Sequence, residues 1–574
     1  MLRYNVIGKH GRVMMLKEKV KELTFAQLVL YISLFFVGIF YEYLSCALSV
    51  ILLVWLCIRF VKRGELKVNV TATFVATGIL ALFYALSILW AIDSGAAVFG
   101  AAKFLPLFLY TLVLFQEEGG REKVIGGLPY VVTFMTVISV IGMYVPIVKA
   151  YFTVSERLSG FFQYPNTFAL VMLVSFLLLL TRERVRILDY ACMAVLIFGI
   201  LYTGSRTVLV LSAVSGLAAL FVTKNRRVRF VALGVVAIGA AGILLYCFIT
   251  DNMWVLSRYL KFSVTESTFV GRILYVRDAL PVILRHPFGL GFKGYYYIQQ
   301  SIQTGAYSVM YIHNDILQIM LDVGWLPCLA FVGAALKNII SKRVALIHKL
   351  VILVILAHAC FDFDLQYVGV FMMLLVFFED RSDTCIVVRK GKGACIAVSA
   401  VLSVLLIYLG VSQALIRFEA FDAVRAVYPA STECDIDILK NSTDMAELDR
   451  TADRIIERNS YVPVAYSVKA RVAYSAGDFA NVVKYKEKTI ELAPLAAAEY
   501  NEYAYMLING ISLYTQAGDS YSADYCKDRL LELRDELENA KARISELGAS
   551  IDMQTKLAFP SEIVEYIGAL EAEQ

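Results

Sequence analysis

Residues 161–180 read FFQYPNTFALVMLVSFLLLL, a short polar entry followed by a long apolar run. A helix needs roughly 20 predominantly apolar residues to cross a bilayer, and this run approaches that length. Strands of a membrane barrel would alternate polar and apolar residues, and this run does not alternate. The segment therefore predicts a transmembrane helix with polar residues at its mouth.

Similar runs recur along the chain, which has 574 residues, of which 59% are hydrophobic and 18% charged. A soluble chain has about 25% charged residues. We therefore predict an all-α, polytopic membrane protein of about 12–13 transmembrane helices, followed by a small soluble helical domain. The predicted spans are 24–43, 45–61, 69–91, 96–115, 124–148, 161–180, 186–203, 205–223, 229–249, 313–336, 344–361, 365–379 and 393–413.

The charges of the loops predict the orientation. With the N-terminus inside, the inner segments hold 26 Lys and Arg, whereas the short outer loops hold three. Because cytoplasmic loops are enriched in these residues, we expect a basic cytoplasmic N-terminus at 1–23, with a first span that is retained. The transmembrane domain is 24–413 with a large external loop, 250–312, and the extracytoplasmic domain is 414–574.

Five polar groups fall on the predicted outer face. Arg side chains there suit an anionic ligand at the membrane surface, although ordinary loop solubility also explains any single one. The fifth group could orient its own His and Asp side chains, or simply form a polar hairpin turn. The groups are Glu156-Arg157 to Pro165-Asn166, Thr203-Gly204-Ser205-Arg206-Thr207, Gly271-Arg272 followed by Arg285-His286-Pro287-Phe288-Gly289-Leu290-Gly291-Phe292, His313-Asn314, and His358 with Asp362 and Asp364.

The order of these motifs resembles the O-antigen ligase and polymerase superfamily of bacterial membranes. The resemblance covers about residues 155–335, and Asp322 stands where many members carry Glu. It implies a glycosyltransferase in the cytoplasmic membrane that needs no metal or cofactor. The donor would be a glycan on polyprenyl pyrophosphate, and the acceptor a hydroxyl of a glycan, lipid or protein. Membrane lipid is a further partner, and nucleic acid is not expected.

The chemistry assigns a role to each candidate residue. Attack on the anomeric carbon needs a base, and His suits this task, so His313 is the first candidate, with Asn314 positioning the acceptor. Arg forks can hold a departing pyrophosphate. The candidates for this contact are Arg206 and Arg272, then Arg157 and Arg285. The supporting candidates are Ser205, His286, His358, Asp362 and Asp364.

The C-terminal segment differs from the membrane part in charge and pattern. Residues 431–574 carry a net charge of −11, whereas residues 1–430 carry +16. The stretch 461–494 resembles a tetratricopeptide unit of two helices, and 521–548 is expected to be helical. Such a domain could dock a protein partner, or it could be a plain helical cap on the membrane domain. Cys434 and Cys526 lie in this segment, and the sequence leaves their pairing open.

Two other functional classes compete with the enzyme. One is a transporter or flippase of lipid-linked oligosaccharide, and the other is a non-catalytic membrane scaffold with a docking tail. A transporter would show charges at the membrane midplane and internal repeats, whereas the polar motifs here gather at one face. The residues do not separate polymerase from ligase, nor do they name the sugar, the oligomeric state or the type of cell envelope.

Overall fold

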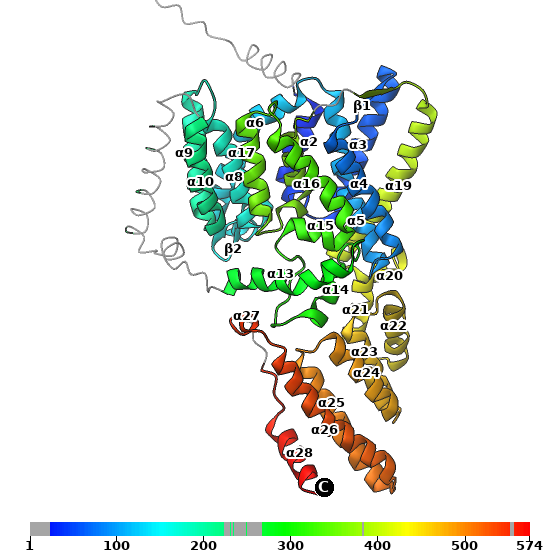
Figure 1. Ribbon diagram of the computed structural model, residues 1–574. Helices are drawn as coiled ribbons and strands as arrows, with labels where there is room; N and C mark the ends of the chain where they lie inside the picture. Colours follow the sequence, from blue (N-terminus) through cyan, green and yellow to red (C-terminus); the bar gives the residue numbers. More distant parts are fainter. Residues whose placement is uncertain are drawn as a thin grey trace, which may run out of the picture. The chain divides into compact units, whose positions relative to one another are not determined.

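The computed structural model of this chain describes residues 23–222, 267–380, 384–551 and 556–573, with the single positions 230, 234, 241 and 248. The chain divides into two compact units, and Figure 1 labels their elements. The membrane unit comprises Met1–Ala81, Ala102–Lys261 and Leu329–Gly410. The loop–tail unit comprises Leu82–Ala101, Phe262–Cys328 and Val411–Gln574, so the chain enters each unit more than once.

Apolar helices dominate the described chain, which confirms the prediction of an all-α polytopic membrane protein. Five helices are long and apolar enough to cross a membrane. They are α3 (Glu42–Arg63), α4 (Ala72–Leu86) continued by η2 (Ser87–Leu89), α5 (Ser94–Gln116), α6 (Gly120–Met143) and α19 (Lys392–Arg417). Shorter apolar helices are α2 (Phe25–Phe35), α8 (Pro165–Leu180), α9 (Ile187–Thr203), α10 (Arg206–Val222), α16 (Trp325–Ile340) and α17 (Leu346–Ala359).

The predicted spans that fall on described residues each contain a helix, although α2 ends at Phe35 within 24–43 and α6 ends at Met143 within 124–148. The span 229–249 lies outside the described residues apart from single positions. The prediction of one continuous helix over 313–336 was wrong, because α15 (Asp315–Val323) ends at Gly324 and α16 begins after it. Gly324 has φ 88°, and a Cβ there would lie 2.2 Å from the carbonyl oxygen of Pro287. The apolar pattern runs through this break, so hydropathy alone does not reveal it.

Helix α8 forms the centre of the membrane unit. All of its residues from Pro165 to Leu180 are buried, and it packs against α6, α9, α10 and α17. A helix enclosed on every side needs no polar face, which explains the uniformly apolar run in its sequence. Shorter elements around it are η1 (Val37–Ile39), α7 (Pro146–Phe152), β2 (Thr153–Val154), β3 (Arg157–Leu158), η3 (Gly160–Phe162), η4 (Asp364–Gln366) and α18 (Val368–Val376).

Loops that were predicted to share a face contact one another within the membrane unit. Strand β1 (Leu66–Asn69), after α3, pairs antiparallel with β4 (Cys385–Val388), before α19. The side chain of Gln116 donates to the carbonyl of Lys67 at 2.7 Å and accepts from its N–H at 3.0 Å. These segments were all predicted to be cytoplasmic. Their contacts place them on one side of the unit, while the identity of that side stays a prediction.

The loop–tail unit is also helical. Within the tail, α23 (Pro463–Ser475) and α24 (Phe479–Leu492) form the expected helix–turn–helix, and Gly477 lies in the turn with φ 72°. Membership of the tetratricopeptide family stays a prediction. Cys434 and Cys526 are both buried free thiols. The helices are α13 (Ser267–Arg285), α14 (Gly294–Ile302), α15, α20 (Phe421–Val427), α21 (Thr432–Asn441), α22 (Met445–Arg458), α23 (Pro463–Ser475), α24 (Phe479–Leu492), α25 (Ala497–Ala517), α26 (Ser520–Ala542), α27 (Glu546–Ala549) and α28 (Ser561–Glu573).

Candidate active site

Arg157 joins three segments of the membrane unit. It lies on β3, and its Nε donates to the carbonyl oxygen of Thr203 at 2.7 Å. A second guanidinium nitrogen donates to Oδ1 of Asn166 at 2.7 Å. Thr203 ends α9, and Asn166 lies in the first turn of α8. Arg157 therefore holds the β2–β3 hairpin against the ends of two helices, beside the turn that carries Arg206.

Asp362 continues this polar network. Its two carboxylate oxygens accept hydrogen bonds from the Tyr164 hydroxyl at 2.8 Å and from Nδ2 of Asn166 at 2.7 Å. Asp362 is buried, so its charge needs such donors. Asn166 thus contacts the Arg157 guanidinium on one side and the Asp362 carboxylate on the other. The predicted first and fifth motifs, far apart in sequence, meet at this amide.

His358 and Asp364 form a second buried pair beside it. Nδ1 of His358 lies 2.5 Å from Oδ2 of Asp364, and the other carboxylate oxygen accepts from the Thr167 hydroxyl at 2.7 Å. Both members of the pair are fully buried. His358 therefore contacts Asp364, whereas Asp362 accepts a hydrogen bond from Asn166. Because the pair connects the end of α17 to the first turn of α8, it supports the geometry around Arg157.

The Gly204-Ser205-Arg206 turn separates α9 from α10. Gly204 has φ 60° and caps the end of α9, which is the left-handed conformation that glycine adopts most readily. Arg206 is the first residue of α10 and is half-buried. Ser205 is buried, and its hydroxyl has no hydrogen-bond partner within the described part of the chain.

His313 and Asn314 lie at the start of α15 in the loop–tail unit. Asn314 is the N-cap, and its Oδ1 accepts a hydrogen bond from the N–H of Leu317 at 3.1 Å. This bond is a normal N-cap contact, so Oδ1 of Asn314 stabilises the start of α15. His313 has φ 53°, an unfavourable conformation for a residue with a Cβ. Such backbone strain persists only where the surroundings impose it, and it concentrates at functional sites.

Tyr275 brings two predicted residues together. Its ring lies 5.9 Å from the His313 ring, measured between centroids, in an edge-to-face arrangement at 72°. Burial raises the pKa of Tyr275, and the positive charge of Arg272 partly offsets this effect. Arg272 lies one helical turn before Tyr275 on α13. Tyr275 therefore contacts the His313 ring and lies one turn from Arg272, and no motif in the sequence marks it.

The His286-to-Gly291 loop packs against the end of α15. The N–H of Leu290 donates to the carbonyl of Leu321 at 2.7 Å, and the N–H of Gly291 donates to that of Asp322 at 2.9 Å. Gly289 has φ 77°, and a Cβ there would meet the Asp322 backbone at 2.6 Å. The glycines of this motif thus allow two backbones to touch. The loop and the His-Asn helix are neighbours for that reason.

Asp322 anchors the same region from inside. It is fully buried, and its carboxylate accepts hydrogen bonds from the Tyr84 hydroxyl at 3.0 Å and from Nε2 of Gln318 at 2.9 Å. The Gln318 side chain also accepts from the N–H of Ile312 at 3.2 Å, immediately before His313. Asp322 therefore positions the segment that carries His313 through a neighbouring amide. The sequence marked Asp322 only as a departure from the family pattern.

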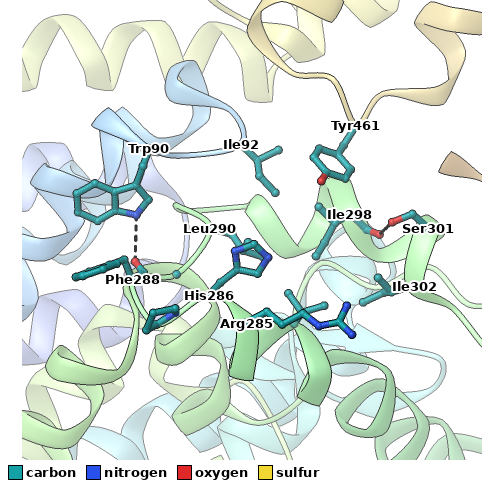
Figure 2. A pocket seen from close by; sticks show the side chains of 13 residues that line it. Trp90, Ile92, Arg285, His286, Phe288, Leu290, Ile298, Ser301, Ile302 and Tyr461 are labelled. Carbon is teal, nitrogen blue, oxygen red and sulfur yellow. Dashed lines mark hydrogen bonds between the residues drawn. The ribbon is translucent and has the colours of Figure 1, made fainter. Parts of the chain in front are cut away.

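Arg285 and His286 line a cavity of 770 Å³ together with Trp90 and Tyr461 (Figure 2). Trp90 comes from the segment before α5, and Tyr461 comes from the tail. Neither Trp90 nor Tyr461 was a predicted site residue, because only the fold brings these two residues close to the Arg285-His286 motif. Among the described residues, no group of three or more His, Cys, Asp and Glu side chains has the arrangement of a metal site.

The candidate residues are divided between the two units. The membrane unit contains Arg157, Ser205, Arg206, His358, Asp362 and Asp364, and the loop–tail unit contains Arg272, Arg285, His286, His313 and Asn314. Both units place Arg and His side chains at helix ends and in loops, within a chain of many apolar helices. The fold defines a polytopic membrane protein whose Arg and His clusters lie at helix ends and in loops.

Comparison with known proteins narrows this class. Residues 191–332 match the family model for O-antigen ligase, and this match supports the resemblance to the O-antigen ligase and polymerase superfamily. Its function is accordingly of the surface-polysaccharide ligase or polymerase type. The matched segment includes Arg206, Arg272, Arg285, His286 and His313-Asn314. No curated protein and no solved structure matches the chain.

Proposed function

We propose that this protein transfers a glycan from polyprenyl pyrophosphate to an acceptor hydroxyl on the outer face of the bacterial cytoplasmic membrane. The observation that carries the proposal is the ring contact between His313 and Tyr275, which lies one helical turn from Arg272 on α13, within the segment that matches the O-antigen ligase family. This region therefore carries a candidate base, His313, and a candidate cation, Arg272. Transfer from a pyrophosphate donor needs that combination.

The proposed reaction is a single displacement at the anomeric carbon. The acceptor oxygen forms a bond to this carbon while the bond from the carbon to the pyrophosphate oxygen breaks. The acceptor proton passes to His313, and polyprenyl pyrophosphate leaves as an anion. Arg272 is proposed to stabilise the charge that develops on it, and Arg206 in the membrane unit is proposed as a separate pyrophosphate contact, with the Ser205 hydroxyl as a further donor. The step requires no cofactor.

The proposed topology follows the loop charges. The N-terminus is cytoplasmic, and the loop–tail segments 250–312 and 414–574 are extracytoplasmic. Contacts among the predicted inner loops support the proposal that these loops lie on one side of the membrane. The contacts of Arg157 and Asn166 support a common side for the predicted outer loops in the same way. Accessibility labelling of single cysteines introduced at Lys62 and Glu156 would test the sides. Reaction of the Lys62 position from outside intact cells would contradict this topology.

A transfer assay tests the proposed roles. With purified full-length protein and lipid-linked donor, His313→Ala is expected to lower the rate by about 10²–10⁴-fold, the usual contribution of a general base. Arg206→Ala and Arg272→Ala are expected to lower it as well. Arg277→Ala is the matched control, because Arg277 is exposed on the same helix as Arg272. Full activity of the folded His313→Ala and Arg206→Ala variants would refute the scheme.

Glycan length in a deletion strain separates the two forms of the function. A strain that lacks a polymerase is expected to show single repeat units on the usual acceptor. A strain that lacks a ligase is expected to accumulate long chains on the lipid carrier. Either result identifies the acceptor class, a second glycan in the first case and a lipid or protein in the second.

A further inference from the structure

The 770 Å³ cavity of the loop–tail unit is built from three segments that are distant in sequence. Trp90 and Ile92 precede α5, the residues between Val282 and Ile302 come from the end of α13, the His-Pro loop and α14, and Tyr461 belongs to the tail. Figure 2 shows Trp90, Tyr461, His286 and Arg285 around the same space. A volume of this size accommodates a small ligand such as one or two sugar rings.

The aromatic walls of the cavity are partly open to solvent. The exposed fraction is 39% for Trp90, 62% for Phe288 and 38% for Tyr461. The indole N–H of Trp90 donates to the carbonyl oxygen of Phe288 at 3.1 Å, which holds the Trp90 ring in place. Fixed aromatic faces beside water are unusual at a purely structural position, because aromatic rings gain most when they are fully buried. They suit a ligand with both an apolar face and a polar edge.

The charge in the cavity has one sign. Arg285 and His286 are its only titratable basic residues, both are exposed, and no Asp or Glu is among the lining residues. Within the described chain, Arg285 makes no ion pair with a carboxylate. A guanidinium in this position can bind a carboxylate or phosphate through two parallel hydrogen bonds. The cavity therefore favours an anion over a neutral or cationic ligand.

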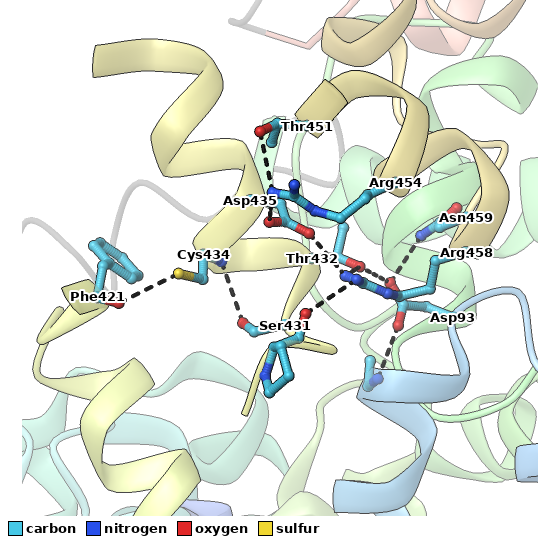
Figure 3. Close-up of polar contacts among 12 residues, drawn as sticks. Asp93, Phe421, Ser431, Thr432, Cys434, Asp435, Thr451, Arg454, Arg458 and Asn459 are labelled. Atoms are coloured by element: carbon cyan, nitrogen blue, oxygen red, sulfur yellow. Dashed lines mark hydrogen bonds and ion pairs between the residues drawn. The ribbon is translucent and has the colours of Figure 1, made fainter. Parts of the chain in front are cut away.

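Asp93, Thr432 and Asn459 form a buried network at the start of the tail (Figure 3), and this network holds the backbone of Tyr461. The N–H of Tyr461 donates to Oδ1 of Asn459 at 3.0 Å, and Nδ2 of Asn459 donates to the buried carboxylate of Asp93 at 3.1 Å. The Thr432 hydroxyl donates to the same carboxylate oxygen at 2.6 Å. Asp93 lies just after Trp90 and Ile92. One carboxylate therefore fixes the spacing between two walls of the cavity.

The far end of the tail contacts the same loop. The N–H of Ser545 donates to the carbonyl of Thr304 at 2.9 Å. Gly548 lies so close to Gly305 that a Cβ on either glycine would fall within 3 Å of the opposite backbone. The tail thus holds the cavity-lining loop on both sides of Ile302. A helical domain that only docked another protein would need neither attachment.

We propose that this cavity is a saccharide subsite that binds an acidic sugar residue of the glycan substrate. Arg285 would bind the anionic group, and the faces of Trp90 and Tyr461 would stack on the sugar ring. The inference rests on the proposed glycan-transfer function and adds to it the substrate class and a role for the tail. The donor pyrophosphate offers a second source of negative charge, so the test separates the two.

Isothermal titration of the purified full-length protein in detergent tests this subsite. The probes are a glucuronic-acid-containing tetrasaccharide, the same oligosaccharide with its carboxyl groups reduced to alcohols, and inorganic pyrophosphate. The acidic tetrasaccharide is expected to bind at least about tenfold more tightly than the reduced one, because a hydrogen bond to a charged group is lost. Inorganic pyrophosphate is expected not to displace it. Equal affinity for both oligosaccharides, or displacement by pyrophosphate, would overturn the proposal.

Variants locate the binding. Arg285→Gln and Tyr461→Ala are each expected to weaken the tetrasaccharide about tenfold, whereas Tyr461→Phe keeps the ring and binds nearly normally. The matched controls are Arg450→Gln and Tyr521→Ala, which alter exposed tail residues away from the cavity and are expected to leave the affinity unchanged. Unchanged binding in both Arg285→Gln and Tyr461→Ala would also refute the subsite.

Failure of the subsite is distinguishable from failure of the proposed function. A protein that transfers glycan but does not discriminate between the two tetrasaccharides retains the proposed function and loses only this inference. A protein that binds the acidic tetrasaccharide through Arg285 and Tyr461 but transfers no glycan from any lipid-linked donor contradicts the proposed function instead.

Discussion

Lys103 and Glu42 form a buried ion pair between two membrane-spanning helices. Nζ of Lys103, on α5, lies 3.1 Å from Oε1 of Glu42, in the first turn of α3. The Lys103 side chain is fully buried, and its ammonium also lies 4.8 Å from the centre of the Phe40 ring. Charged residues within membrane spans are rare and are paired when they occur. We therefore expect the pair to respond strongly when one partner is removed.

Lys103→Met is the informative perturbation. The substitution keeps the length of the side chain but leaves the Glu42 carboxylate without its cation. Loss of one partner of a buried pair costs about 3–5 kcal/mol, since the remaining charge stays in a medium that solvates it poorly. Replacing both residues, as in Lys103→Met with Glu42→Met, removes the desolvation cost together with the attraction. The double variant is therefore expected to be much more stable than the single one.

The cysteines of the chain provide the assay. Cys46, Cys192 and Cys328 are buried free thiols, so a dye that reacts with exposed thiols reports unfolding of the detergent-solubilised protein. Denaturation is followed for the wild type, both single variants and the double variant. The expected order of unfolding midpoints is wild type and double variant highest, with both single variants clearly below them.

The double-mutant cycle also defines the refuting result. If the pair interacts as described, the loss in the double variant is smaller than the sum of the two single losses by more than about 1 kcal/mol. Additive losses would show that Lys103 and Glu42 are not coupled. A Lys103→Met protein as stable as the wild type would contradict the inferred burial of both charges.

Two further predictions concern the loop and the tail. Gly324→Ala places a Cβ 2.2 Å from the Pro287 carbonyl at a left-handed φ, so we expect loss of glycan transfer at a stability cost of about 1–3 kcal/mol; normal transfer would contradict the close packing at this break. Burial raises the pKa of Glu502, but Arg471 and Lys486 outweigh this effect and hold that pKa below its ordinary value of 4.5. Its stabilisation is therefore full above pH 4.5 and falls as the pH drops through the lower folded value. Circular-dichroism melts of the wild type and Glu502→Gln should converge in acid, and a difference that does not vary with pH would refute this reading.

The sequence motifs predicted which residue types occur at the candidate site, but they did not predict which of these residues contact one another. Arg157, Asn166 and Asp362 were all quoted from the sequence, yet nothing local indicates that Asn166 lies between the other two. Their contact depends on how α8 and the turn after α17 pack in three dimensions. The same holds for Tyr275. Its contact with the His313 ring forms only because α13 lies beside the start of α15.

The break at Gly324 shows why hydropathy does not predict where one helix ends and the next begins. The residues on both sides are apolar, so averaging over a window predicts one span. The backbone separates them because the Pro287 segment passes within contact distance of Gly324. Only a segment more than 30 residues away in sequence carries that information, and no local pattern includes it.

The sequence by itself determined the class of the protein and the residue types at its candidate sites. Apolar runs dictate helices because the bilayer interior offers no water to backbone N–H and C=O groups, so each segment must satisfy them internally. That constraint is local, and composition reveals it. Only the tertiary structure decided which loops meet, as in the contact of Asp93 with Asn459 across 366 residues. Such contacts depend on packing and on the pairing of buried polar groups, which are properties of the folded chain as a whole.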